Sequence, residues 1–181
     1  MNRLKRVSFV WGILPILLIT MLLNTGGVQA GGTWKLIPGA NPSATYNGLR
    51  GVAAVTTNDV WAVGAYSKTQ NTHQPLIEHW NGAKWIVVPS PSPGSVENAL
   101  FGVAGLSANN IWAVGRDDQG LGGRTLIEQW NGFTWSVVSS PNKGSGDNTL
   151  FAVARVPSIQ KAWAVGQYSS NNSQTIFEYH Q

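Results

Sequence analysis

The chain has 181 residues and no cysteine, with 12 Lys or Arg against 8 Asp or Glu. The lack of cysteine excludes disulfides, thiol catalysis and cysteine-based metal sites. Three of the basic residues, Arg3, Lys5 and Arg6, lie at the N-terminus. The rest of the chain is therefore nearly neutral and offers no basic stripe for nucleic acid.

The first thirty residues have the three parts of a secretory signal peptide. After the basic residues, an apolar run interrupted by Pro15 occupies residues 9–23, and the small-residue sequence Val28-Gln29-Ala30 follows it. An uncleaved anchor is the alternative, but a spanning helix needs about 20 apolar residues. We expect cleavage after Ala30, a secreted chain of residues 31–181 that forms one domain, and no stable membrane span after cleavage.

Three repeats follow, marked by VWAVG, IWAVG and AWAVG at residues 60–64, 111–115 and 162–166. All eight tryptophans outside the signal fall into three repeated positions: Trp61, Trp112 and Trp163; Trp34, Trp85 and Trp135; and Trp80 and Trp130, with Tyr179 in the third repeat. Glutamates recur in step as Glu78, Glu128 and Glu178, and leucines as Leu49, Leu100 and Leu150. Self-similarity at a fixed period predicts a repeat architecture, in which we assign the tryptophans and glutamates structural roles.

Each repeat predicts four short strands, A to D, rich in Val, Ile and Trp and without a helical period. In chain order they are D at 33–38; A to D at 49–55, 60–64, 75–80 and 84–89; A to D at 100–106, 111–115, 125–130 and 134–139; and A to C at 150–156, 162–166 and 175–179. Asn81-Gly82 and Asn131-Gly132 join strands C and D, and Asn-Gly between apolar runs predicts a tight hairpin. The sequence thus predicts an all-β fold of three four-stranded antiparallel repeats.

Side-chain size grows from the Gly, Ala and Val of strands A and B to the Leu, Ile and paired Trp of strands C and D. A propeller blade needs this taper, because its inner strands crowd the axis. The combination of WAVG with EHWNG..W resembles repeats of secreted bacterial proteins of the β-propeller type, loosely related to kelch and tectonin repeats. The resemblance covers residues 33–181 and implies a fold and an export route, but no activity.

Three repeats are fewer than the four to eight blades of a propeller. We therefore weigh three arrangements: two copies that close a six-bladed ring, each lending its first strand D to the other; a partial propeller cut from a longer chain; and a β-trefoil. The chain runs D-A-B-C three times in whole repeats, which suits the ring. The size gradient favours blades over a trefoil.

Length variation within the repeats concentrates in the loops between strands B and C, at residues 65–75, 116–125 and 167–175. Variable loops of a repeat protein often gather on its binding face. The candidate binding residues on this loop face are Tyr66, His73, Arg116, Asp117, Asp118, Arg124 and Tyr168.

Catalytic and metal-binding patterns are weak in this sequence. One Glu per repeat does not supply the six to eight oxygens that Ca²⁺ requires, so we expect no metal and no cofactor. A glycan hydrolase would need two carboxylates at a defined separation, for which Asp59, Asp117, Asp118 and Asp147 are the candidates. The histidines are His73, His79 and His180, there is no GxSxG, and we expect His79 to be merely exposed.

We therefore expect a secreted, non-catalytic repeat protein that presents a binding surface to carbohydrate or to an envelope protein. Two alternatives stay open: an enzyme acting on glycans, and a truncated or scaffold unit whose partner is another copy of itself.

Overall fold

A computed structural model describes residues 32–156, 161–169 and 172–180. The predicted signal peptide lies outside the described residues. The chain divides into two units, residues 1–36 and 37–181. In the first unit, residues 32–36 form no strand. Among the described residues, no helix has the length and hydropathy needed to cross a membrane.

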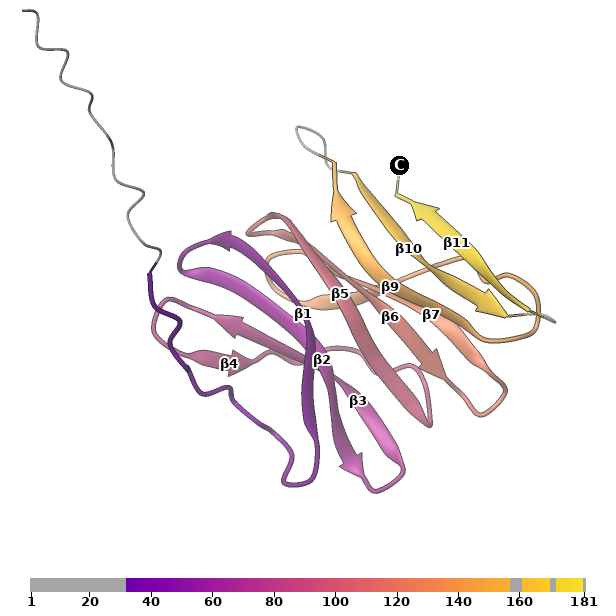
Figure 1. The fold of residues 1–181 in the computed structure, drawn as a ribbon, viewed down its shortest axis with the longest axis horizontal. Helices are drawn as coiled ribbons and strands as arrows, with labels where there is room; N and C mark the ends of the chain where they lie inside the picture. Colours follow the sequence, from indigo (N-terminus) through magenta and orange to yellow (C-terminus); the bar gives the residue numbers. More distant parts are fainter. Residues whose placement is uncertain (1–31, 157–160, 170–171, 181) are drawn as a thin grey trace, which may run out of the picture. The chain divides into compact units, whose positions relative to one another are not determined.

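The second unit is all-β and consists of three antiparallel sheets (Figure 1). Sheet 1 contains β1 (Asn47–Thr56), β2 (Asp59–Thr69), β3 (Thr72–Trp80) and β4 (Trp85–Val87). Sheet 2 contains β5 (Glu97–Ser107), β6 (Asn110–Asp118), β7 (Gly123–Trp130) and β8 (Trp135–Val138). Sheet 3 contains β9 (Asn148–Arg155), β10 (Ala162–Ser169) and β11 (Ser173–Tyr179). This confirms the predicted all-β fold of three blade-like repeats; among the described residues no sheet closes into a barrel, so the trefoil alternative is not adopted.

One predicted strand is wrong. Residues 33–38 carry the strand D sequence, yet residues 32–43 form no strand, and among the described residues sheet 3 has three strands instead of four. A strand exists only where another edge accepts its backbone hydrogen bonds. Residues 33–38 therefore have the sequence of a strand, but among the described residues no strand edge pairs with them.

The Asn-Gly hairpins are confirmed. Gly82 and Gly132 adopt φ of 91° and 99°, a region open to glycine at little cost. In the first turn, the Asn81 Oδ1 accepts hydrogen bonds from the backbone N–H groups of Ala83 and Lys84, both at 3.1 Å. The equivalent bonds to Asn131 form in the second turn. The same local chemistry therefore closes the outer hairpin of sheets 1 and 2.

In each sheet, the close approach of two backbones explains why the WAVG motif ends in glycine. Gly115 lies opposite Leu100, where an extra residue, Phe101, shifts the register between β5 and β6. A Cβ on Gly115 would overlap the carbonyl oxygen of Ala99. Gly64 and Gly166 have the same relation to the carbonyl oxygens of Gly48 and Thr149. The motif therefore marks a β-bulge at which two backbones approach too closely for a side chain.

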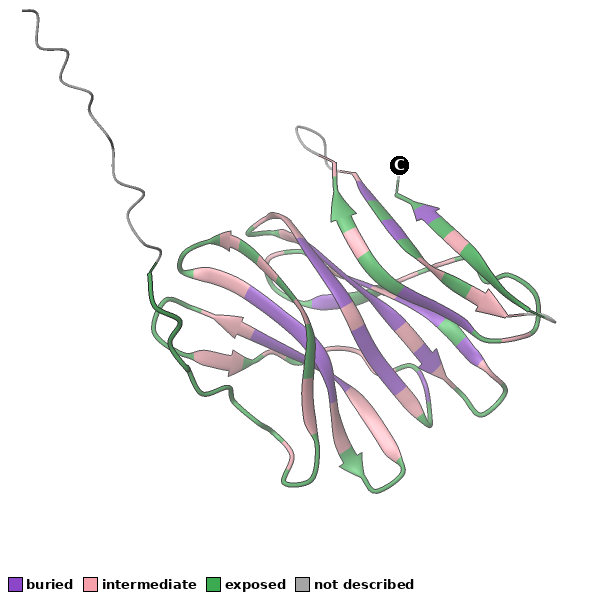
Figure 2. Ribbon diagram, viewed as in Figure 1, coloured by how far each residue is buried: buried purple, intermediate pink, exposed green. Residues whose placement is uncertain are grey.

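Apolar side chains fill the spaces between neighbouring sheets. The larger cluster joins sheets 1 and 2 around Trp61, and a smaller cluster of Val114, Leu150 and Ala164 joins sheets 2 and 3. Trp61 contacts two tryptophans of sheet 2, with ring centroids 5.1 Å from Trp130 and 5.5 Å from Trp135. Figure 2 shows the deepest burial in the strands of sheet 2 and more exposed positions in β1, β9 and β11.

The register corrects one position of the repeat. Tyr179 lies opposite Trp163, just as His79 lies opposite Trp61. His180, and not Tyr179, therefore takes the place of Trp80 and Trp130 in the third repeat. Its ring lies 4.4 Å from that of Trp112, which matches the contact between Trp130 and Trp61. A shift of one residue turns a strand side chain to the opposite face, so the correction decides which residue faces sheet 2.

Candidate functional site

The predicted loop-face residues lie at the same end of the strands but on three sheets. The hairpins β2–β3, β6–β7 and β10–β11 follow the lower right edge of the view in Figure 1. Tyr66 and His73 belong to sheet 1 and Tyr168 belongs to sheet 3, whereas the four charged residues gather on sheet 2, as Arg116, Asp117, Asp118 and Arg124. The structure therefore brings together four of the seven residues.

Arg116 is the centre of this cluster. Its guanidinium contacts three carboxylates: Asp118 Oδ2 at 3.1 Å, Glu97 Oε2 at 3.5 Å and Asp147 Oδ1 at 3.9 Å. Glu97 begins β5 and Asp147 lies in the loop before β9, so they come from separate parts of the chain. We had not predicted Glu97, because an acidic residue at the start of a strand carries no motif.

A second ion pair lies next to the first. Arg124 Nη2 lies 3.4 Å from Asp117 Oδ2; the Asp117 side chain is buried, while that of Arg124 is 53% exposed. Together the two pairs place two guanidinium groups among four carboxylates. The hairpin edge of sheet 2 is therefore mildly acidic, with Arg124 as its accessible cation.

A small hollow of about 200 Å³ with a mixed polar and apolar lining lies beside Arg124. It lies between residues 119–124 and residues 142–148, and it is lined by Gln119, Leu121, Arg124, Asn142, Ser145 and Asn148 together with glycines. Gly120 and Gly122 adopt φ of 86° and 111°, so the loop requires glycine at both positions. Its shape is also fixed by the Gly123 N–H, which donates to Asp147 Oδ1 at 2.6 Å.

Three asparagines, of which Asn98 and Asn148 are buried, hold the loops that precede each first strand. Asn98 Oδ1 accepts from the Gly94 N–H at 2.6 Å, and its Nδ2 donates to the carbonyl oxygens of Gly94 and His73. Asn148 and Asn47 hold the loops before β9 and β1 in the same way. We had not predicted this role, although the three asparagines recur two residues before the repeated leucines. They fix the loops that flank the candidate site.

The repeated glutamates link successive sheets. Each accepts a hydrogen bond from a residue 38 positions earlier: Glu78 from the Ala40 N–H at 3.1 Å, Glu128 from the Ser90 hydroxyl, and Glu178 from the Ser140 hydroxyl at 2.7 Å. Burial raises the pKa of Glu128 to about 7, and the Ser90 hydrogen bond offsets part of that rise. Burial raises the pKa of Glu178 too, again partly offset by Ser140. Within the described residues, no group of His, Asp and Glu could hold a metal ion.

Asp59 and His79 form a separate pair at the other end of the strands. Asp59 Oδ1 accepts from Trp61 Nε1 at 2.9 Å and lies 2.8 Å from His79 Nε2. The imidazole stacks on the indole of Trp61 at 4.2 Å, so the expectation of a merely exposed His79 is wrong. Sheet 2 has Asn110 and Gln129 at these positions, and sheet 3 has Lys161 over the Tyr179 ring. The position that Asp59 and His79 hold in sheet 1 is thus held by a different pair of side chains in each of the three sheets.

Replacing Asp59 by alanine tests this packing role. The change removes the acceptor of a nearly buried indole N–H, so we expect a loss of about 1–2 kcal/mol in the free energy of unfolding. Lys161→Ala is the matched control at the same position of sheet 3, where Trp163 is half exposed, and it should be nearly neutral. Urea denaturation of both variants measures the difference; equal midpoints would contradict the role given to Asp59.

Three of the four acidic candidates for catalysis, Asp117, Asp118 and Asp147, gather around Arg116 and Arg124, and Asp59 lies apart from them. Asp59 begins β2 and Asp118 ends β6, so these two carboxylates lie at opposite ends of the strands in neighbouring sheets. Asp118 and Asp147 share the Arg116 guanidinium, and Asp117 pairs with Arg124. Every one of these carboxylates therefore already has a charged or hydrogen-bonding partner.

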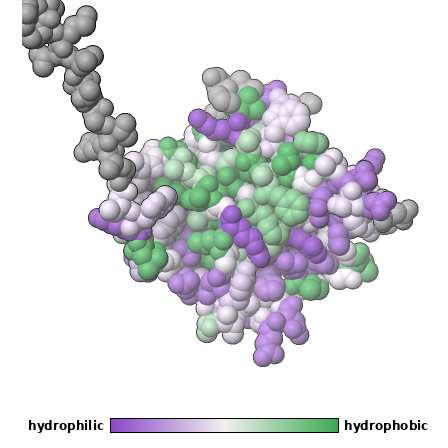
Figure 3. All heavy atoms as spheres, viewed as in Figure 1, coloured by the Kyte–Doolittle hydropathy of each residue, from purple (hydrophilic) through white to green (hydrophobic). Residues whose placement is uncertain are grey.

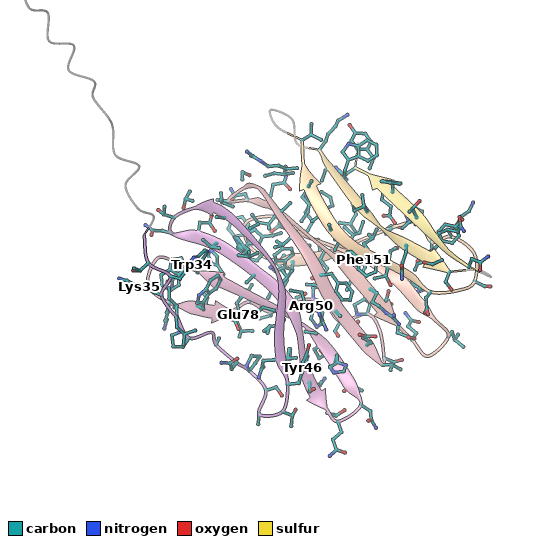
Figure 4. The ribbon with its side chains drawn as sticks, viewed as in Figure 1. Trp34, Lys35, Tyr46, Arg50, Glu78 and Phe151 are labelled. Carbon is teal, nitrogen blue, oxygen red and sulfur yellow. The ribbon has the colours of Figure 1, made fainter. Side chains whose placement is uncertain are left out.

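The first strands form a further surface, shown in Figures 3 and 4. An apolar area crosses the middle of the face in Figure 3, and Leu49, Val52 and Phe151 are exposed on β1 and β9. Arg50, labelled in Figure 4, lies 5.0 Å above the ring of Phe101.

Comparison of the chain with protein-family models and with curated proteins found no match.

Proposed function

We propose that the protein is an exported, non-catalytic repeat protein that binds carbohydrate at the hairpin edge of sheet 2. The observation that carries the proposal is the small hollow beside the exposed Arg124. The Arg124 side chain is 53% exposed and lines this hollow, and a guanidinium forms directional hydrogen bonds with hydroxyls. The hollow is smaller than the roughly 300–1,000 Å³ of pockets that enclose a drug-sized ligand. It therefore suits one sugar residue of a longer glycan.

The absence of catalysis is part of the same proposal. A general acid or base must be within hydrogen-bond reach of the proton that it transfers. Asp118 and Asp147 are held by Arg116, and Asp147 also accepts from the Gly123 N–H. The two carboxylates are therefore engaged in bonds that hold the loops of the site. Export rests on the predicted signal peptide and places the protein where glycans are exposed.

A glycan array with the purified exported protein tests this function. We expect selective binding, and we expect Arg124→Ala to weaken it by about tenfold or more, as for loss of a well-placed arginine at an interface. Because Arg124→Ala also removes the cation that pairs with the buried Asp117, which costs stability, circular dichroism of the variant must show the native spectrum before its binding is compared. Lys143→Ala is the control, since Lys143 lies in the loop 142–148 but is not among the residues that line the hollow.

Three results would contradict the proposal. Glycan binding that survives Arg124→Ala would place the site elsewhere, and release of reducing sugar from a bound glycan would show an enzyme. Binding confined to an envelope protein, with no glycan bound, would replace carbohydrate as the ligand.

A further inference from the structure

The outer edge of sheet 3 is incomplete. In sheets 1 and 2, β3 pairs with β4 and β7 pairs with β8. Among the described residues, β11 pairs with β10 alone. The backbone groups on the other side of β11 are therefore open to a further strand.

The fourth strand of a sheet does more than extend its edge. Trp135 of β8 is 3% exposed and fills the space between sheets 1 and 2, where its ring contacts those of Trp61 and Trp130. Trp61 is 2% exposed, and its counterpart Trp112 is 3% exposed beside a sheet without a fourth strand among the described residues, so the contribution of Trp135 is seen in the ring contacts and not in the burial of Trp61. A tryptophan from the fourth strand is thus a main component of the packing between two sheets.

The equivalent space between sheets 2 and 3 is a cavity of about 240 Å³. Trp112 and His180 line it, in the positions that Trp61 and Trp130 hold around Trp135. Val138, Ala162, Phe177 and Tyr179 complete a largely apolar wall. An apolar cavity of roughly 150 Å³ already admits benzene, so this cavity has room for an indole.

Residues 33–38 have the sequence that this cavity needs. TWKLIP aligns with KWIVVP and TWSVVS of the other two repeats, and Trp34 and Leu36 are fully exposed. Following the pairing of Trp130 with Trp135 and of Gln129 with Ser136, Trp34 would lie opposite His180 and Lys35 opposite Tyr179.

The links between sheets indicate which sheet this segment completes. β4 belongs to sheet 1, and Ser90 after it bonds to Glu128 on sheet 2; β8 belongs to sheet 2, and Ser140 after it bonds to Glu178 on sheet 3. Ala40 bonds to Glu78 on sheet 1. By this pattern residues 33–38 complete a sheet that precedes sheet 1, and sheet 3 of a second copy has the edge to receive it.

The exposed faces of sheets 1 and 3 suit the same contact. Trp163 on sheet 3 is 47% exposed, although its equivalents Trp61 and Trp112 are buried. Trp80 and Trp85 on sheet 1, whose rings are 5.9 Å apart, hold the positions from which Trp130 and Trp135 cover Trp61. They would cover Trp163 of the neighbouring copy.

We propose that two copies of this chain close a ring of six sheets by exchanging residues 33–38. Each segment adds a fourth strand to β11 of the other copy, and its Trp34 enters the cavity between sheets 2 and 3. The exchange is reciprocal, as a twofold symmetric dimer requires. It is independent of the carbohydrate site.

Light scattering on the purified exported chain tests the proposal, with its N-terminus verified by mass spectrometry. We expect twice the mass of one chain. Trp34→Ala should raise the dimer dissociation constant by about 100-fold or more, because two buried aromatic anchors are lost and each costs at least tenfold. Lys35→Ala is the matched control and should leave the dimer intact. Since Trp34 is exposed in the single chain, the tryptophan variant should keep its circular dichroism spectrum.

Cross-linking gives a second measurement in a chain that has no cysteine of its own. A Lys35→Cys chain mixed with a Tyr179→Cys chain should form a disulfide between the two on mild oxidation, whereas either variant alone should not. A monomer at all concentrations, a dimer that survives Trp34→Ala, open assemblies of many copies, or no cross-link in the mixture would each overturn the closed ring.

Discussion

Replacing Gly115 by alanine should cost about 3 kcal/mol or more of folding free energy, as overpacking against a fixed backbone does. Gly115 lies in β6, a central strand of the middle sheet. The new methyl group would overlap the carbonyl oxygen of Ala99 at the β-bulge. Neither backbone can move away without breaking the pairing of β5 with β6. The loss is a large part of the roughly 5–15 kcal/mol that stabilises a typical domain.

Urea or thermal denaturation measures this effect. Gly32→Ala is the control, because a Cβ on Gly32 meets no atom within 4 Å, and its midpoint should match that of the unmodified protein. If Gly115→Ala unfolds at the same urea concentration as the control, the bulge tolerates a side chain and the structural account of the WAVG glycine is wrong.

The second large effect is a decrease in stability between pH 4.5 and pH 7 that depends on Glu128. The pKa of Glu128 rises from 4.5 to about 7 in the folded chain because the carboxyl is buried. Between these values the folded protein binds a proton that the unfolded chain has released, so the free energy of unfolding falls as pH rises. At 1.36 kcal/mol per pKa unit the contribution is about 3 kcal/mol. It is complete below pH 4.5 and lost above pH 7.

Glu128→Gln should remove this dependence. Denaturation midpoints at several pH values should show a flatter profile for the variant and a higher relative stability at pH 8, where the native carboxylate is charged. Ser90→Ala is the matched change, because loss of the Ser90 hydrogen bond should raise the pKa of Glu128 further and move the transition to higher pH. A Glu128→Gln protein with the full pH dependence of the native chain would assign the effect to other groups, such as Glu178.

Local sequence signals were sufficient for most of the fold. Asn81-Gly82 and Asn131-Gly132 predicted the outer hairpins because the turn chemistry lies within two residues. The repeated tryptophans predicted the packing between sheets 1 and 2, where Trp61 and Trp135 are buried, whereas Trp163 and Trp34 are exposed. The error at Tyr179 arose because an aromatic residue stood next to the aligned position. Only the strand register separates Tyr179 from His180, and these two residues point to opposite faces.

The features that could not be predicted from the sequence depend on contacts between residues far apart in the chain. Residues 33–38 look like a strand, but whether they form one depends on an edge elsewhere. The cluster on sheet 2 joins Arg116 to Glu97 and Asp147, which are 19 and 31 positions away from it in the printed sequence. No motif links residues at such separations. Their proximity follows from the way β5, β6 and the loop before β9 meet at one end of the sheets.

The hydrogen bonds to Glu78, Glu128 and Glu178 have a consequence for how such a chain could evolve. Each bond spans 38 residues, and those to Glu128 and Glu178 join one sheet to the next, so a sheet depends mainly on its two neighbours, as in other repeat proteins. A gene segment of one repeat carries both halves of the connection: the hydrogen-bond donor after its fourth strand and the glutamate in its third strand. Unequal crossing-over could therefore add or delete a whole repeat and leave every remaining junction matched.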